Sequence, residues 1–187
     1  MDGTLTIPQH DFDSIRQRLD IPLGEDILAH IDGRSKADQI KAKKILFEWE
    51  HELAHKAQPD PDAAALLQML SENGCKLGVL TRNLTALAHI TLNAAGLAHF
   101  FDTDAILGRD VGEPKPNPDG IYRICKLLQQ SPKKTVMTGD YIHDTQAGRQ
   151  AGCLTILIDS TMNLGHPPCT DIRIKSLKAL NNALLGI

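Results

Sequence analysis

The 187-residue sequence predicts an α/β fold: a parallel sheet with helices on both faces, accompanied by a small α-helical cap. Two observations support this class. From residue 60 onward, short apolar runs alternate with segments of helical periodicity, and glycines stand where several of these helices should end. Residues 7–60 show helical periodicity alone, which is typical of an insertion between two parts of an α/β core.

The elements of the α/β part can be placed by their boundary residues. Asp60 and Pro61 suit the start of a helix over 61–73, and Gly74 suits its left-handed end. Asn117 is placed to cap another helix. We expect the other helices over 84–95, 118–130, 143–151 and 175–185, and the strands over 75–80, 104–107, 135–138 and 154–158. Right-handed crossovers would join these strands into a Rossmann-like sheet with a site at its carboxyl edge.

The helical segment divides the chain into two predicted parts. We expect an α/β core made of residues 1–6 and 61–187, and a cap made of residues 7–60. Ser35 and Asp38 have the spacing of a capping box ahead of one cap helix. We place Trp49 in the cap core rather than at a substrate, and Arg34 on the surface, with contact to a substrate anion as its alternative.

Composition excludes several classes of function. Hydrophobic residues make up 42% and charged residues 23%, as in ordinary globular proteins, and the net charge is -3 without a dense basic block. Nucleic acid is therefore not an expected partner. No apolar run approaches the roughly 18 to 20 residues that cross a bilayer, so we expect no membrane association and a cytoplasmic location. The four cysteines form no CxxC motif and are expected to be buried structural thiols. No feature predicts an oligomeric state.

Four short stretches carry candidate chemistry, and each alone has an ordinary structural explanation such as a turn or a helix start. They are DGTLT at 2–6, VLTRN at 79–83, EPKPNP at 113–118 and TGDYIHD at 138–144. In this order, and at these predicted strand ends, they resemble the motifs of the haloacid dehalogenase superfamily of phosphohydrolases. The closest resemblance is to its phosphoglycolate phosphatase-like group, which has a helical cap after the first motif.

The resemblance implies a Mg²⁺-dependent phosphatase that hydrolyses a small-molecule phosphate ester through an aspartyl phosphate. Asp2 matches the second Asp of the family's DxD pair, which protonates the leaving alcohol and later activates water. Asp140 would bind Mg²⁺ through its carboxylate and Asp2 through its backbone carbonyl.

Four further residues would complete this site. Lys115 would neutralise the phosphoryl oxygens and the nucleophile, and Asp144 would orient Lys115. The phosphoryl group would be bound by Thr81 and by the backbone amides of Arg82 and Asn83.

The family's nucleophilic Asp would stand two positions before Asp2, where this numbering has no residue, and Met1 would be the spacer. In the family that Asp ends the central strand of the sheet. We therefore expect the first strand to be missing from this numbering and the native gene to start upstream. A shifted register with Asp2 as the nucleophile, as in ion-pumping ATPases, is disfavoured because Leu5 replaces a glycine of that motif.

Three alternatives accompany the phosphatase hypothesis. A phosphomutase of the same family would share every motif and differ in how the cap protects the intermediate from water. A non-catalytic protein that binds phosphate and Mg²⁺ would account for the missing nucleophile. A dehalogenase is disfavoured because that branch needs no metal and lacks the second Asp, whereas Asp2 is present.

Overall fold

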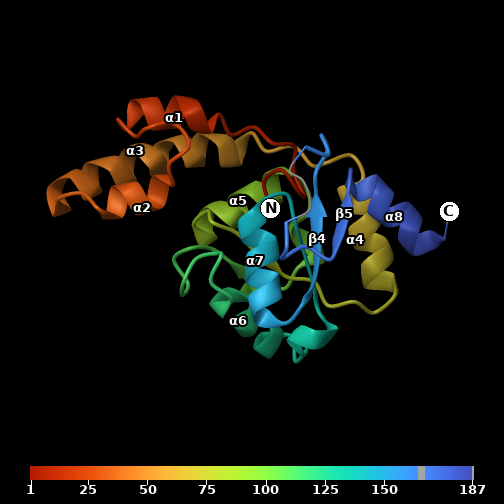
Figure 1. Ribbon diagram of the computed structural model, residues 1–187. Coiled ribbons are helices and arrows are strands. Elements are labelled where there is room, and N and C mark those ends of the chain that lie inside the picture. Colours follow the sequence, from red (N-terminus) through yellow and green to blue (C-terminus); the bar gives the residue numbers. More distant parts are fainter. Residues whose placement is uncertain (164–166, 187) are drawn as a thin grey trace.

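The computed structural model describes residues 1–163 and 167–186. Figure 1 shows a helical arm that extends from an α/β body, with the amino-terminal turn between them. The arm consists of α1 (Phe12–Arg18), α2 (Ile27–Asp32) and α3 (Lys36–His55). Within the described residues, no helix is long and apolar enough to span a membrane.

The body alternates helices with short strands, as the sequence predicts. Its helices are α4 (Ala63–Glu72), α5 (Thr85–Ala94), α6 (Asp119–Leu127), α7 (Ile142–Ala151) and α8 (Leu177–Leu185). Its 3-10 helices are η1 (Ala98–Phe100), η2 (Thr103–Ala105) and η3 (Pro132–Lys134). Its strands are β1 (Val79–Leu80), β2 (Ile106–Leu107), β3 (Val136–Gly139), β4 (Leu154–Ile158) and β5 (Ile172–Ile174).

In the part of the chain that the structure describes, the named strands all pair in parallel, which confirms the predicted α/β class. β1 pairs with β2, and β3, β4 and β5 form a second sheet in that order. Among the described residues no strand joins β1 to β3, so the strands form two sheets, and the gap lies where the central strand was expected to be missing from this numbering. Residues 1–6 form a turn in which the amides of Thr4, Leu5 and Thr6 donate to the Met1 carbonyl.

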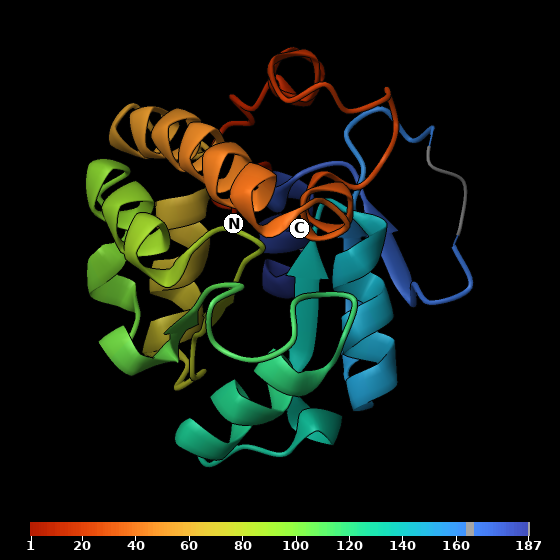
Figure 2. The ribbon, with the colours of Figure 1, turned by 90° about the vertical axis from the view of Figure 1, so that its left-hand side faces the viewer.

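Helices cover the strands from two sides. One apolar cluster joins α4, α5 and α8 to β1 and β2, around Leu66, Leu92 and Ile106. Another lies between α6 and α7, around Ile121 and Ala147. Figure 2 shows α3 lying along α5 on one side and α7 beside β3 on the other. This arrangement brings the ends of β1 and β3 under the helical arm.

The helical arm has an apolar cluster of its own. Its buried members are Ile15, Leu19, Ile21, Ile31, Ala42 and Leu46. Each helix begins at a side-chain cap: Asp11, Asp26 and Ser35 accept from amides three residues further on. The predicted contact between Ser35 and Asp38 is confirmed, since the Asp38 amide donates to Ser35 Oγ at 3.3 Å.

Several predicted boundaries were wrong, and two share a cause. The Asp60 carboxylate accepts from the Asp62 amide, and the Asn117 side chain accepts from the Asp119 amide, at 2.9 and 3.0 Å. Each side chain closes a local turn instead of capping a helix, so α4 begins two residues and α6 one residue later than predicted. Cys75 is also exposed rather than buried.

The strand prediction failed at two places. Of the strand predicted over 75–80, only Val79–Leu80 is paired, because its described partner β2 is itself two residues long. β5 was not predicted, since Ile172–Ile174 is a short run with a central arginine. Its register is held by β4, where Ile156 pairs with Ile172.

Candidate active site

The amino-terminal turn brings the first motif against the end of β3. Gly3 has a φ of +76°, and its amide donates to the Thr6 carbonyl at 3.0 Å. A Cβ atom on Gly3 would lie 2.4 Å from Asp140 Oδ2, closer than such atoms can approach. Glycine is therefore needed here both for the left-handed backbone and for the close approach of Asp140.

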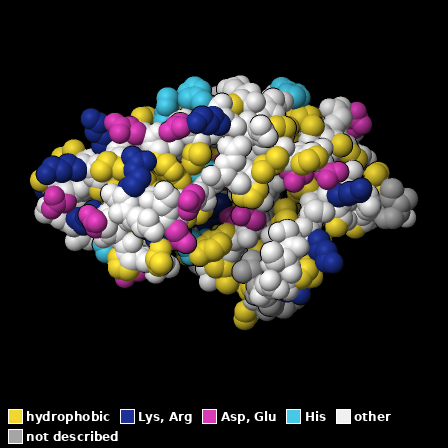
Figure 3. Space-filling model, turned by 90° about the horizontal axis from the view of Figure 1, so that it is seen from above, with side chains coloured by type: hydrophobic (Ala, Val, Ile, Leu, Met, Phe, Trp, Pro, Cys, Tyr) yellow, Lys and Arg dark blue, Asp and Glu magenta, His cyan; other side chains and the backbone are white. Residues whose placement is uncertain are grey.

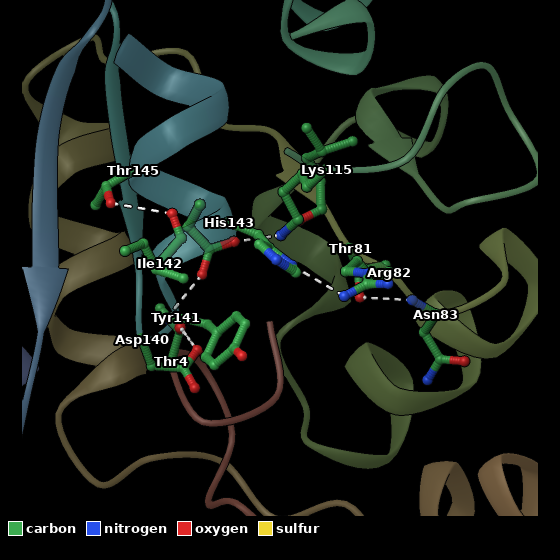
Figure 4. Close-up of polar contacts among 12 residues, drawn as sticks. Thr4, Thr81, Arg82, Asn83, Lys115, Asp140, Tyr141, Ile142, His143 and Thr145 are labelled. Atoms are coloured by element: carbon green, nitrogen blue, oxygen red, sulfur yellow. Dashed lines mark hydrogen bonds and ion pairs between the residues drawn. The ribbon is translucent and has the colours of Figure 1, made fainter. Parts of the chain in front are cut away.

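Asp140 follows β3 directly and is held by the first motif. Thr4 Oγ1 donates to Asp140 Oδ1 at 2.7 Å, and Thr4 is buried (Figure 4). Asp2 and Asp140 both line the cavity described below. Two motifs that are 136 positions apart in the sequence are thus joined at one point.

Lys115 reaches the same point from the loop between β2 and α6. Its Nζ donates to Asp144 Oδ1 at 2.5 Å and to the Leu80 carbonyl at 2.7 Å. The other oxygen of Asp144, Oδ2, accepts from the Tyr141 amide at 3.0 Å. The ammonium group therefore connects the end of β1 with the first turn of α7, and its position is fixed.

Asp144 remains ionised despite its burial. Removal from water by itself would raise the pKa of Asp144, but the adjacent Lys115 charge and the hydrogen bonds from Lys115 and the Tyr141 amide outweigh this effect. The net result is a pKa of Asp144 below its ordinary value. Lys115 and Asp144 thus form a buried ion pair, with 6% and 8% of their side chains exposed.

Thr81 follows β1 and is buried. Its amide donates to the Leu107 carbonyl at 3.0 Å, and its Oγ1 accepts from the Asn83 amide at 3.1 Å. The Asn83 side chain in turn accepts from the Leu84 amide. An anion bound by the Asn83 amide would therefore replace the Thr81 hydroxyl as its acceptor.

The Arg82 side chain connects the body to the helical arm. One terminal nitrogen donates to Asp26 Oδ2 at 2.5 Å, and the other lies 2.9 Å from His143 Nδ1. Burial, followed by the Arg82 charge, lowers the pKa of His143. Among the described residues, the buried Arg82 Nε has no hydrogen-bond partner, so it can donate to a ligand.

A second ion pair connects α3 with the body. Both terminal nitrogens of Arg109 donate to Glu50, each at 2.8 Å, and one of them also donates to the Arg82 carbonyl at 2.7 Å. Burial raises the pKa of Glu50 even though Arg109 acts in the opposite direction. The pair therefore joins the arm to the turn that contains Thr81 and Asn83.

Three aromatic rings stand on the arm beside these charges. The His10 ring is stacked on Phe12 at a centroid distance of 5.4 Å and meets Trp49 edge-on at 5.2 Å. Phe12 and Trp49 also meet edge-on, at 5.9 Å. These three residues, here called the aromatic wall, line the same cavity as Asp2 and Asp140.

The cavity lies between the arm and the body and measures about 500 Å³. Figure 3 shows acidic side chains gathered around a recessed basic one near the middle of this face. Every site residue predicted from the sequence lines this cavity, namely Asp2, Thr81, Arg82, Asn83, Lys115, Asp140 and Asp144.

A divalent cation can be considered from the donors present. The described residues contain no group of three or more His, Cys, Asp or Glu side chains arranged to hold a metal. Mg²⁺, however, commonly takes one or two carboxylates and completes its shell with water and substrate phosphate. The Asp140 carboxylate, with Asp2 beside it in the cavity, fits that pattern.

Sequence reasoning missed several residues of the cavity. Glu50, Arg109 and Asp26 were not singled out, because no motif surrounds them and their partners are at least 56 positions away. Trp49 was assigned to the arm's interior but also lines the cavity. The Arg34 side chain, considered for substrate contact, donates to the Leu19 carbonyl and does not line this cavity.

Comparison with known proteins identifies similar chains. The model of the haloacid dehalogenase-like hydrolase family matches residues 6–158. A haloacid dehalogenase-like hydrolase domain-containing protein of Arabidopsis thaliana is 32% identical over 202 residues, covering 98% of this chain and 81% of its own. A phosphoglycolate phosphatase of Aquifex aeolicus is 34% identical over 101 residues, covering 54% of this chain and 46% of its own.

Solved structures show the same fold. The crystal structure of a phosphatase of this family from Thermococcus onnurineus has a TM-score of 0.71 and 26% identity, and the match covers 100% of this chain and 95% of that one. A hydrolase from Pseudomonas syringae has a TM-score of 0.76 at 21% identity, covering 100% and 95% of the two chains.

Proposed function

The chain belongs to the haloacid dehalogenase-like hydrolase family, and on that premise we propose that it is a Mg²⁺-dependent phosphatase that hydrolyses a small phosphorylated metabolite. One observation supports this most strongly. Asp2, Asp140 and the buried Lys115–Asp144 pair, which come from three separate motifs, line a single cavity together with Thr81. This set combines acidic oxygens for a cation with a fixed ammonium for a phosphoryl group.

Charge is the main obstacle to the proposed reaction, because a phosphate monoester dianion repels a carboxylate nucleophile. Lys115 would offset part of this charge from a position fixed by Asp144 and the Leu80 carbonyl. Asp140, with the backbone carbonyl of Asp2, would hold Mg²⁺. When bound, the cation would polarise a phosphoryl oxygen and neutralise charge in the transition state.

The remaining phosphoryl oxygens would be bound at the turn after β1. Thr81 supplies a hydroxyl there, and the amides of Arg82 and Asn83 are further donors. The Nε of Arg82, which has no hydrogen-bond partner among the described residues, would add a donor that the sequence did not predict. The hydrogen bond from Arg109 to the Arg82 carbonyl would keep this turn in place.

Proton transfer is assigned to Asp2. The family's nucleophile attacks phosphorus, the bond to the leaving oxygen breaks, and Asp2 gives its proton to that oxygen. Water would then attack the phosphorus of the aspartyl phosphate while Asp2 accepts the proton that this water loses, the bond from phosphorus to the nucleophile's oxygen breaks, and phosphate and the free carboxylate are released. In the family's motif the nucleophilic Asp stands two positions before the residue that Asp2 matches.

Residues 7–60 are proposed to act as a cap over the substrate. Two ion pairs support this role, since Glu50 contacts Arg109 and Asp26 contacts Arg82 across the cavity. Closure of such a cap would exclude bulk water from the phosphoryl group. A covered cavity favours a small metabolite over a phosphoprotein.

The test is phosphate release from p-nitrophenyl phosphate, with and without Mg²⁺. It is run on the printed chain and on a chain extended upstream to include an Asp two positions before Asp2. We expect Mg²⁺-dependent turnover when that Asp is present. Asp2→Asn in that chain should release about one equivalent of nitrophenol and then stall, because nitrophenolate leaves without a proton but hydrolysis of the intermediate needs the base. Absence of turnover in both chains would refute the catalytic proposal.

A further inference from the structure

The cavity extends well beyond the residues that would bind phosphate. Its volume of about 500 Å³ lies in the range of roughly 300–1,000 Å³ that encloses drug-sized ligands. Asp2, Lys115 and Asp140 line it from the body, and the aromatic wall lines it from the arm. The volume therefore leaves room for a leaving group larger than two or three carbon atoms.

One ring of the aromatic wall, that of Phe12, is exposed. Phe12 leaves 50% of its surface accessible although it is a large apolar residue, and it lines the cavity together with Trp49. Aromatic side chains of this kind gain free energy when another ring stacks on them or meets them edge-on. A flat ring in the ligand would cover this exposed apolar surface.

The charges beside the wall argue against an anionic leaving group. Each arginine that lines the cavity is already paired with a carboxylate, at distances between 2.5 and 3.0 Å. Among the described lining residues, carboxylates also outnumber lysine and arginine side chains. A second anion on the substrate would therefore find no uncompensated arginine. The pairs are Arg16–Asp13, Arg82–Asp26 and Arg109–Glu50.

We propose that the aromatic wall is a subsite for an uncharged leaving group with an aromatic or heteroaromatic ring, so that the substrate is the phosphate monoester of a ring-bearing alcohol. This inference rests on the proposed phosphatase function and adds the substrate class. It also separates this chain from a phosphatase for carboxylated esters, because each arginine of the cavity lining is already paired with a carboxylate.

Binding can be measured without turnover by using phosphonates, which are not hydrolysed. Trp49 is the only tryptophan of the chain and stands in the wall, so its fluorescence reports occupancy of the subsite directly. With Mg²⁺ present, benzylphosphonate should bind about tenfold or more tightly than ethylphosphonate, because a phenyl ring buries far more apolar surface. 3-Phosphonopropionate, which carries a carboxylate, should bind no more tightly than ethylphosphonate.

Two matched variants locate the effect. Phe12→Ala should reduce the preference for benzylphosphonate by about three- to tenfold and leave ethylphosphonate binding unchanged. Phe47→Ala, which removes a similarly exposed ring that lies outside the cavity lining on the same helix as Trp49, should change neither. Equal affinity for benzyl- and ethylphosphonate, or tighter binding of 3-phosphonopropionate, would overturn the subsite. Neither result would affect the phosphatase proposal, which fails only if no monoester is hydrolysed.

Discussion

The Lys115 ammonium lies 2.5 Å from Asp144 Oδ1, and both side chains are almost completely buried. A buried ion pair contributes little net stability, because removing two charges from water costs about as much as their attraction returns. Its value here is positional. By also bonding the Leu80 carbonyl, Lys115 holds one cation at the point where β1, β3 and the amino-terminal turn meet.

Asp144→Asn should destabilise the protein by about 3–5 kcal/mol, because it leaves the Lys115 charge buried without a carboxylate. Urea unfolding measures this free energy. Lys115→Met should be similarly costly, while the double variant should lose much less than the sum of the two. Additive losses would show that the two side chains are not coupled as the structure indicates.

The same pair predicts how stability depends on pH. The pKa of Asp144 is lowered in the folded protein, so its contribution is present above the unfolded value of about 3.9 and is lost as pH falls through the folded pKa. The difference in unfolding free energy between the wild type and Asp144→Asn should therefore be constant near neutral pH and shrink below about pH 4. A difference that grows in acid would contradict the lowered pKa.

The order of elements could be predicted because it depends on local signals. Gly74, Gly96 and Gly152 all have positive φ next to a helix end, as their positions in the sequence indicated. The pairing of strands was harder, since β5 is only three residues long and is defined by its partner β4. The start of α4 was also hard to predict, because an acidic residue before a proline, such as Asp60, can either cap a helix or close a local turn.

The site was predictable where chemistry is concentrated in motifs. Asp2, Lys115 and Asp140 stand in short stretches whose residue types suit phosphate and a cation, and the structure brings them to one cavity. Glu50 and Arg109 carry no such signal. Each is an ordinary charged residue in the sequence, and their partnership exists only because α3 folds back over the body.

The close approach of Gly3 to Asp140 gives a prediction about metal binding. Gly3→Ala would place a Cβ atom 2.4 Å from Asp140 Oδ2 and displace that carboxylate. In the wild type, Mg²⁺ at about 100 times its dissociation constant should add about 2.7 kcal/mol of stability, seen as a higher melting temperature. Gly3→Ala should lose most of this increase, as should Asp140→Asn.

A matched glycine separates collision from backbone strain. Gly96 has a φ of +71°, close to the +76° of Gly3, but a Cβ atom there would meet nothing within 4 Å. Gly96→Ala should therefore lower the melting temperature through strain alone and keep the full response to Mg²⁺. An equal loss of the response in both variants would show that strain, and not Asp140, is responsible.

The Glu50–Arg109 pair predicts a coupling between the arm and the body. The side chains of Glu50 and Arg109 are only 10% and 13% exposed, so replacing either one leaves the other charge nearly buried without its partner. A double-mutant cycle of Glu50→Ala and Arg109→Ala, followed by urea unfolding, should therefore give a coupling energy of about 1–3 kcal/mol. Lys56 and Glu52 provide the control, since this pair on or next to α3 is 64% and 66% exposed and should couple far more weakly because water screens it. Because Arg109 also donates to the Arg82 carbonyl, its loss should weaken binding of inorganic phosphate, whereas Lys56→Ala should not. Coupling of Glu50 and Arg109 no stronger than that of the control pair would mean that the arm is not fastened to the body at this point.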